Sequence, residues 1–411
     1  MPDLNSTPSA SRIQIGIFGR RNAGKSSLMN ALTDQSAALV SENPGTTTDP
    51  VFKAMEMLPL GPVTFIDTAG LDDTGVLGEL RVKRSYDVLD RTDLALLVID
   101  AQIGLTEFEI KIAGEIRQKK IPALVVVNKA DLQSLIPENK ADWQEKLGMD
   151  LVEVSASRGK GINELKSALI QCARNIEEEP FLVGDLIKPG DFAVLVIPID
   201  KAAPKGRLIL PQQQVIRDIL EHDAMAVVTK EYELKVTLEN LGKKPAIVIT
   251  DSQAFLKVAA DTPKEIALTS FSILFARQKG NLTDLVRGAQ AVENLKPGDH
   301  ILIAEGCTHH RQSDDIGTVK IPRWLRQTVG GELNFSWSSG QHLPEDLSRY
   351  QLMVHCGGCM LNRREMMHRL SLAKAQSVSI VNYGVLIAYL QGIFPRALEP
   401  FPEVRELFRE Y

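Results

Sequence analysis

A glycine-rich run near the N-terminus constrains the fold of this chain more than any other feature. Residues Gly19–Ser26 match the pattern Gly-x-x-x-x-Gly-Lys-Ser/Thr, after an apolar run at 13–18 and before a helix expected over 24–33. In this strand–loop–helix setting, glycines let backbone N–H groups surround a phosphate, and the helix N-terminus favours negative charge. The run predicts a phosphate-binding loop that opens an α/β domain.

The side chains of this loop have expected roles in holding a nucleotide. Lys25 is expected to neutralise the β- and γ-phosphate oxygens, and Ser26 to ligate Mg²⁺. The positions expected to contact the nucleotide here are Gly19, Asn22, Ala23, Gly24, Lys25, Ser26 and Ser27. A chance glycine-rich turn would satisfy the same pattern, so the loop alone does not identify its ligand.

Three further motifs follow expected strands, in the order that a guanine-nucleotide site requires. They are Asp67-Thr68-Ala69-Gly70 after 63–66, Asn128-Lys129-Ala130-Asp131 after 123–127, and Ser155-Ala156 after 152–154. Asp67 is expected to hold Mg²⁺ through water, and Gly70 to contact the γ-phosphate. The Asp131 carboxylate can accept two N–H bonds from guanine, a pair of donors that adenine lacks. The apolar run 94–99 is typical of a strand in a parallel sheet covered on both faces.

Together these motifs resemble those of the small GTPases, which implies GTP and GDP as ligands. The loop 43–49 resembles switch I of the TrmE–Era–EngA group, which makes Lys25, Thr47, Asp67 and Gly70 the expected catalytic set, with Thr47 on Mg²⁺. Leu71 stands where Ras-like enzymes place a water-orienting glutamine, so hydrolysis is expected to be slow. Asn22 matches an asparagine that ligates K⁺ in potassium-activated members of the group.

A second constellation lies near the C-terminus and favours a metal centre. It comprises Cys307, His309 and the run His355–Cys359, which reads His-Cys-Gly-Gly-Cys. The Cys356/Cys359 spacing lets two thiolates from one turn reach one metal. Because three cysteines do not complete a tetrahedral site, His309, His355 or an exchangeable ligand would take the fourth position. The spacing alone fits both zinc and an iron–sulfur cluster.

Length and composition set the domain count and the class of protein. The chain has 411 residues and a net charge of −5. Its sequence shows no pattern typical of a signal peptide, a membrane span or a basic nucleic-acid surface, so we expect none of these. A cytoplasmic setting is expected, in which clustered cysteines favour metal chemistry over disulfides. We expect a flexible tail over 1–11, a P-loop domain with a mostly parallel sheet over 12–176, a small α/β docking module over 177–262 and a metal-binding α/β domain over 263–411.

The whole arrangement looks like the HydF type of [FeFe]-hydrogenase maturation GTPase. The resemblance implies a [4Fe–4S] cluster on Cys307, Cys356 and Cys359 with an exchangeable fourth position, and a middle domain that forms a homodimer. It also implies that a transient di-iron precursor is received with the help of two radical-SAM maturation enzymes and passed to the apo-hydrogenase. GTP would gate these associations.

Two other classes of protein share parts of this pattern. A ribosome- or RNA-associated GTPase with a zinc-stabilised C-terminal domain would use the same first domain, but the acidic net charge counts against it. A tRNA-modifying enzyme would require a folate or flavin site, for which the sequence shows no motif.

Overall fold

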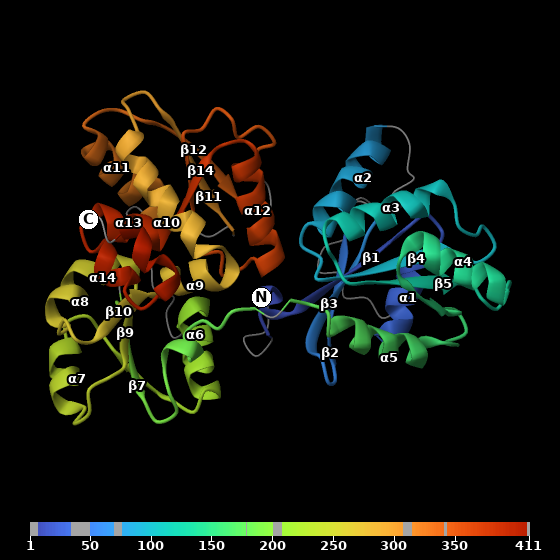
Figure 1. The fold of residues 1–411 in the computed structure, drawn as a ribbon, viewed down its shortest axis with the longest axis horizontal. Helices are drawn as coiled ribbons and strands as arrows, with labels where there is room; N and C mark the ends of the chain where they lie inside the picture. The colour runs from blue at the N-terminus through green and yellow to red at the C-terminus, as the bar shows by residue number, and fades with distance from the viewer. Residues whose placement is uncertain are drawn as a thin grey trace. The chain divides into compact units, whose positions relative to one another are not determined.

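Residues 7–33, 50–69, 76–177, 179–199, 208–306, 315–340 and 343–408 are described by a computed structural model of the chain. Five positions with predicted roles, Thr47, Gly70, Leu71, Cys307 and His309, lie outside these ranges. The chain divides into two units, Met1–Glu178 and Glu179–Tyr411, and each is described by itself (Figure 1). In the described part of the chain, no helix is both long and apolar enough to cross a membrane.

The first unit is built on a six-stranded sheet of order β2-β3-β1-β4-β5-β6, in which only β2 runs antiparallel. Its strands are β1 (Ile13–Gly19), β2 (Val51–Met57), β3 (Gly61–Asp67), β4 (Leu94–Asp100), β5 (Ala123–Asn128) and β6 (Asp150–Glu153). Its helices are α1 (Lys25–Leu32), α2 (Val76–Leu89), α3 (Glu107–Gln118), α4 (Pro137–Leu147) and α5 (Ile162–Ala173). The predicted P-loop domain with a mostly parallel sheet is confirmed.

The central strand β4 shows why this sheet is covered on both faces. Every residue of β4 is buried, and alternate residues point to opposite faces. Leu94, Leu96 and Val98 join the core that holds α1 and α5, whereas Ala95, Leu97 and Ile99 join the core that holds α3 and α4. Cys172 of α5 lies in the first of these cores, and burial raises its pKa to about 11.

Residues 9–11, at the end of the tail expected over 1–11, form regular structure. Ser9–Ser11 forms the 3₁₀ turn η1, Ala10 is buried, and the Ser9 carbonyl accepts a hydrogen bond from the side chain of Gln14. The segment next to β1 is therefore packed against the first unit rather than a free tail.

The second unit contains two four-stranded parallel sheets, of order β10-β9-β7-β8 and β12-β11-β13-β14. The first has β7 (Phe192–Val196), β8 (Met225–Thr229), β9 (Ile247–Thr250) and β10 (Ala267–Ser270), and the second has β11 (His300–Glu305), β12 (Asn334–Ser339), β13 (Leu352–His355) and β14 (Ser379–Asn382). The helices are α6 (Leu210–Glu221), α7 (Leu234–Asn240), α8 (Phe255–Asp261), α9 (Phe271–Lys279), α10 (Leu282–Gln290), α11 (Ile321–Val329), α12 (Arg363–Ala375), α13 (Tyr383–Leu390) and α14 (Phe394–Leu398). The prediction of further α/β structure after the first domain is confirmed.

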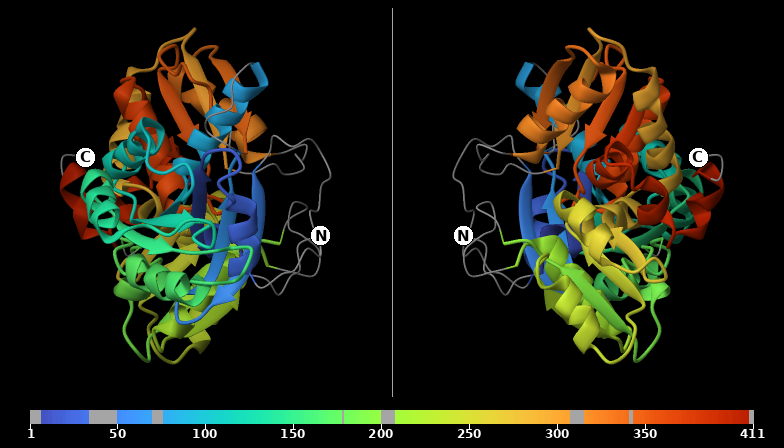
Figure 2. Two further views of the ribbon diagram at one scale, coloured as in Figure 1. Left: turned by 90° about the vertical axis from the view of Figure 1, so that its right-hand side faces the viewer. Right: turned by 90° about the vertical axis from the view of Figure 1, so that its left-hand side faces the viewer.

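One hydrophobic core joins these two sheets. It contains Leu195 and Ile249 of the first sheet together with Ile301 and Val354 of the second. Helices α9, α13 and α14 lie between the sheets (Figures 1 and 2). Buried apolar residues occur on several faces of α9, because this helix is covered by protein on both sides. Strand β10 pairs with β9 and extends the first of these sheets to Ser270, beyond the boundary expected between 262 and 263.

Candidate functional site

The loop between β1 and α1 requires glycine at two positions. Gly19 and Gly24 have φ values of +147° and +91°, a region that L side chains rarely adopt. A Cβ atom on Gly19 would lie 2.4 Å from the carbonyl oxygen of Val98, and one on Gly24 would lie 2.2 Å from Nδ2 of Asn128. The two glycines therefore let the loop backbone approach β4 and β5 more closely than any side chain permits.

Lys25 begins α1 and folds back over this loop. Its Nζ atom donates to the carbonyl oxygens of Gly19 (3.0 Å) and Arg20 (2.8 Å), and the side chain is buried. These acceptors are neutral, so an anionic phosphate would compete well for the ammonium donors. Asn22 is exposed, with a left-handed φ of 62°. The loop thus holds a buried ammonium group beside its own backbone carbonyls.

Ser26 and Asp67 bring two oxygen ligands together at the ends of α1 and β3. The Ser26 hydroxyl donates to Oδ2 of Asp67 at 2.5 Å. The other carboxylate oxygen, Oδ1, is buried without a hydrogen-bond partner in the described part of the chain. Burial raises the pKa of Asp67, whereas the hydrogen bond from Ser26 and the charge of Lys25 act to lower it. A hydroxyl and an unpaired carboxylate oxygen fit the hard-oxygen preference of Mg²⁺.

Asn128, at the end of β5, ties two loops of the site together. Its Nδ2 atom donates to the carbonyl oxygen of Ala23 at 2.9 Å, and its Oδ1 atom accepts from the backbone N–H of Ala156 at 3.1 Å. The side chain is 2% exposed, so both bonds form away from water. Asn128 therefore acts as a buried link between the phosphate loop and the loop after β6.

Asp131 presents a carboxylate beside this link. Arg158 lies 3.0 Å from its Oδ2 atom through Nε, and a hydrogen bond from the Ser155 hydroxyl leads the influences that lower the pKa of Asp131. Lys129 has a left-handed φ of 63° and pairs through Nζ with Oδ2 of Asp100 at 2.6 Å. The carboxylate is thus held ionised as an acceptor, as guanine recognition requires.

The second site begins where β11 and β13 end. Cys356 follows β13, and its Sγ atom accepts backbone N–H bonds from Gly306 (3.1 Å) and Gly358 (3.4 Å). Gly358 has a φ of 66°, which turns the chain so that its N–H faces the sulfur. Burial raises the pKa of the Cys356 thiol, and these two N–H groups act in the opposite direction. Such N–H···S bonds suit a thiolate ligand.

A cavity of about 240 Å³ opens beside this loop, within the second unit. Cys356 and Cys359 line it together with apolar side chains of α9 and α13. Glu305 and Tyr383 also line it; the Tyr383 hydroxyl donates to Oε1 of Glu305 at 3.2 Å, and burial raises the pKa of Tyr383 well above its usual value. Sequence reasoning missed both residues, because their meeting depends on the packing of α13 against β11. Within the described ranges, no group of three or more His, Cys, Asp or Glu side chains has metal-binding geometry.

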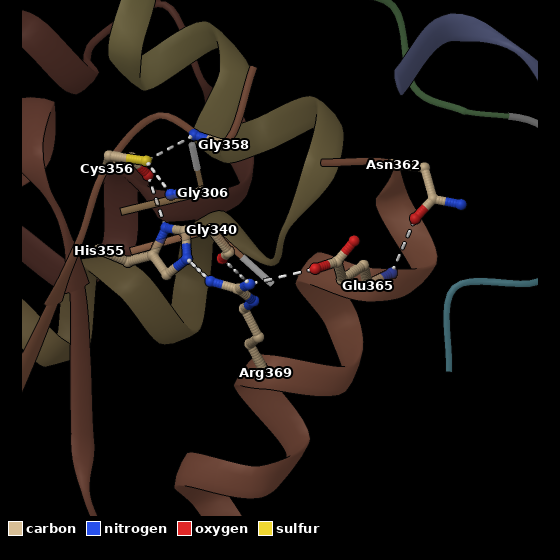
Figure 3. A network of polar contacts seen from close by, with 8 residues as sticks. All are labelled: Gly306, Gly340, His355, Cys356, Gly358, Asn362, Glu365 and Arg369. Atoms are coloured by element: carbon tan, nitrogen blue, oxygen red, sulfur yellow. Dashed lines mark hydrogen bonds and ion pairs between the residues drawn. The ribbon is translucent and has the colours of Figure 1, made fainter. Parts of the chain in front are cut away.

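His355 does not present a free nitrogen to this cavity. The ring is fully buried, its Nδ1 atom lies 2.8 Å from the carbonyl oxygen of Cys356, and its Nε2 atom lies 3.0 Å from Nη1 of Arg369 (Figure 3). Burial and the charge of Arg369 lower the pKa of His355 to about 3. Both ring nitrogens are engaged with the protein, which argues against His355 as the fourth metal ligand that the sequence left open.

Comparison with known proteins assigns the family. Residues 182–280 match a family model described as the hydrogen maturase F dimerization domain, and residues 283–400 match one described as the hydrogen maturase F tetramerization domain. The chain belongs to the hydrogen maturase F family. Residues 14–129 match a model described as a 50S ribosome-binding GTPase, so this hydrogen maturase F chain carries the GTPase domain predicted from its motifs.

Curated relatives match about two fifths of this chain. GTPase Der of Mycoplasmopsis pulmonis is 35% identical over 178 residues, covering 40% of this chain and 41% of its own length. The tRNA modification GTPase MnmE of Aquifex aeolicus is 37% identical over 168 residues, covering 40% of this chain and 36% of its own length. The chain thus spans about two fifths of the length of these relatives. Among solved structures, an Era variant of Aquifex aeolicus bound to GDP·AlF4⁻ aligns at 19% identity with a TM-score of 0.35, over 61% of this chain and 99% of that chain.

Proposed function

We propose that this chain is a GTP-hydrolysing scaffold that carries a [4Fe–4S] cluster during the maturation of [FeFe]-hydrogenase. The observation behind the proposal is a pair of sites in one hydrogen maturase F chain. Asn128 links the loops of a nucleotide site, and the sulfur of Cys356 accepts two backbone N–H bonds beside a cavity.

The nucleotide site would bind GTP and GDP through groups of the loops that follow β1, β3, β5 and β6. Lys25 would exchange its carbonyl partners for phosphate oxygens, and Ser26 and Asp67 would hold Mg²⁺ directly or through water. Asp131 would accept the guanine N–H groups once Arg158 moves aside, while Lys129, Ser155 and Ala156 border the base. Thr47 and Gly70 are the proposed contacts to the γ-phosphate.

Hydrolysis at this site is proposed to be slow. Leu71, in the position of a water-orienting glutamine, cannot polarise water. Asn22 is proposed to hold a K⁺ ion beside the phosphates, where its charge would stabilise the transition state. Nucleotide turnover of this kind suits a switch that gates partner association.

A [4Fe–4S] cluster, when bound, supplies iron that can be reduced and that offers a coordination position to a cargo. Cys307, Cys356 and Cys359 would hold it. Gly306, the residue before Cys307, donates to Sγ of Cys356, which supports the convergence of the three thiols. With both nitrogens of His355 engaged, His309 or an exchangeable ligand would complete the site.

The substrate of this scaffold is proposed to be a di-iron precursor. Two radical-SAM maturation enzymes would supply it, and apo-[FeFe]-hydrogenase would receive it. The matches to models named for dimerization and tetramerization support assembly of several copies, with a homodimer formed through the middle domain.

A ribosome- or RNA-associated GTPase with a zinc-bound C-terminal domain is the second candidate. The name of the matched GTPase model and the tRNA modification relatives favour it. The net charge of −5 and the family of the second unit count against it.

Anaerobic purification followed by visible spectroscopy and metal analysis tests the proposal. The wild-type chain should be brown and contain iron and sulfide, and Cys356→Ser should lose the colour. Lys25→Ala should lose GTP turnover and keep the colour, because the two sites lie on different units. A colourless protein that contains zinc would refute the cluster and favour the second candidate.

A further inference from the structure

A buried arginine stands behind the cysteine loop. Arg369 of α12 is 2% exposed, and its guanidinium has three protein acceptors (Figure 3). Nη1 donates to Nε2 of His355 at 3.0 Å, and Nη2 donates to the carbonyl oxygen of Gly340 at 2.7 Å and to Oε1 of Glu365 at 3.1 Å. Burying a guanidinium is costly unless it is paired and hydrogen-bonded, so this arrangement is a specific one.

The arginine fixes the protonation of the histidine ring. A guanidinium carries only donors and stays charged in proteins, so Nε2 of His355 must be the acceptor of their hydrogen bond. The ring proton then resides on Nδ1, which donates to the carbonyl oxygen of Cys356 at 2.8 Å. The donors and acceptors of these groups therefore fix the direction of both hydrogen bonds: Arg369 donates to His355, and His355 donates to the carbonyl oxygen of Cys356.

The Cys356 backbone is held at both ends. Its N–H donates to the carbonyl oxygen of Ala304 at 3.0 Å, and its carbonyl oxygen accepts from His355 and, at 3.4 Å, from Nδ2 of Asn382. Because this carbonyl is held in place, the peptide that joins Cys356 to Gly357 is held as well. That peptide in turn sets the direction in which the Gly358 N–H points toward the sulfur. Ligands held in this way by outer hydrogen bonds bind their metal more tightly.

We propose that His355 and Arg369 form a positioning pair that orients the Cys356 peptide, and that His355 is not an iron ligand. This inference rests on the proposed cluster at Cys356 and Cys359. Breaking the pair should leave three thiolates able to take up iron but should loosen their geometry.

The test uses the full chain, reconstituted anaerobically with iron and sulfide. Iron loss to a chelator should be about 10-fold faster in His355→Ala and in Arg369→Met than in the wild type. The double variant should lose iron no faster than the worse single variant, because both substitutions break one chain of hydrogen bonds. His355→Asn, whose amide can donate from near the Nδ1 position, should retain most of the wild-type rate. Lys374→Met, on an exposed turn of the same helix, is the matched control.

Pulsed electron paramagnetic resonance of the reduced cluster supplies a readout that loss of stability alone would not change. In D₂O, the coupling of the exchangeable N–H deuteron near the sulfur should change in His355→Ala and stay unchanged in His355→Asn. A directly bonded nitrogen that is present in the wild type and absent from His355→Asn would overturn the inference. Wild-type iron retention in Arg369→Met, with GTP binding and circular dichroism unchanged, would also overturn it. A wild-type chain that binds no cluster would instead refute the proposed function.

Discussion

Removal of the Asn128 side chain should weaken nucleotide binding even though the amide is expected to contact the protein rather than the phosphates. Asn128→Ala deletes a hydrogen bond to the Ala23 carbonyl at 2.9 Å and one from the Ala156 N–H at 3.1 Å, both away from water. Each hydrogen bond contributes about 1 kcal/mol net, so the substitution removes about 2 kcal/mol of the free energy that stabilises the two loops against each other. If all of it supports the binding conformation, the GDP dissociation constant rises about 30-fold.

Titration with a fluorescent GDP analogue measures this change directly in the full chain. Asn163→Ala is the matched control, because Asn163 is exposed on α5 of the same unit. The control should bind like the wild type. An unchanged dissociation constant for Asn128→Ala would refute the view that this side chain organises the site.

Three further outcomes are expected for the first unit. Gly24→Ala should abolish GDP binding, because its Cβ would lie 2.2 Å from Nδ2 of Asn128 at a φ of +91°; retained binding in a filter assay would contradict the loop geometry. Arg158→Ala should increase GDP affinity at low salt by freeing Asp131, and the gain should vanish at high salt, whereas a loss of affinity would mean that the arginine holds the nucleotide. The pKa of the Cys172 thiol is raised from 9.0 to about 11, so as pH rises the unfolded chain loses this proton at a lower pH than the folded chain. The free energy of unfolding should therefore fall between pH 9 and 11, by about 2 kcal/mol at most. In Cys172→Ala, thermal stability should depend less on pH over this range.

The strongest predictions from sequence were those in which motif and strand periodicity coincide. The loop Gly19–Ser26 and the buried strand β4 follow directly from residue type and spacing. Strands β2 and β12 were missed because their residues are partly exposed and do not form apolar runs; β12 contains Ser336, Ser338 and Ser339. Each of them forms a strand by hydrogen-bonding to the edge of a neighbouring strand, β2 to β3 and β12 to β11.

The environment of the cysteines was less accessible to sequence reasoning than the cysteines themselves. The pattern His355–Cys359 indicated ligand types, but not that Arg369 would occupy a nitrogen of His355. That contact depends on how α12 packs beside β13, which no local pattern encodes. The same holds for the boundary near 262, because the pairing of β10 with β9 is a long-range contact.

We propose that one chain holds both a nucleotide site and an iron–sulfur site whose fourth ligand is exchangeable. Mössbauer spectroscopy of the ⁵⁷Fe-reconstituted full chain, with iron and sulfide counted per chain, can reveal such a cluster. We predict about four iron and four sulfide per chain, with one iron distinct from the others because its ligand is exchangeable. Four equivalent thiolate-bound irons, or a chain that takes up zinc and no iron, would contradict the account.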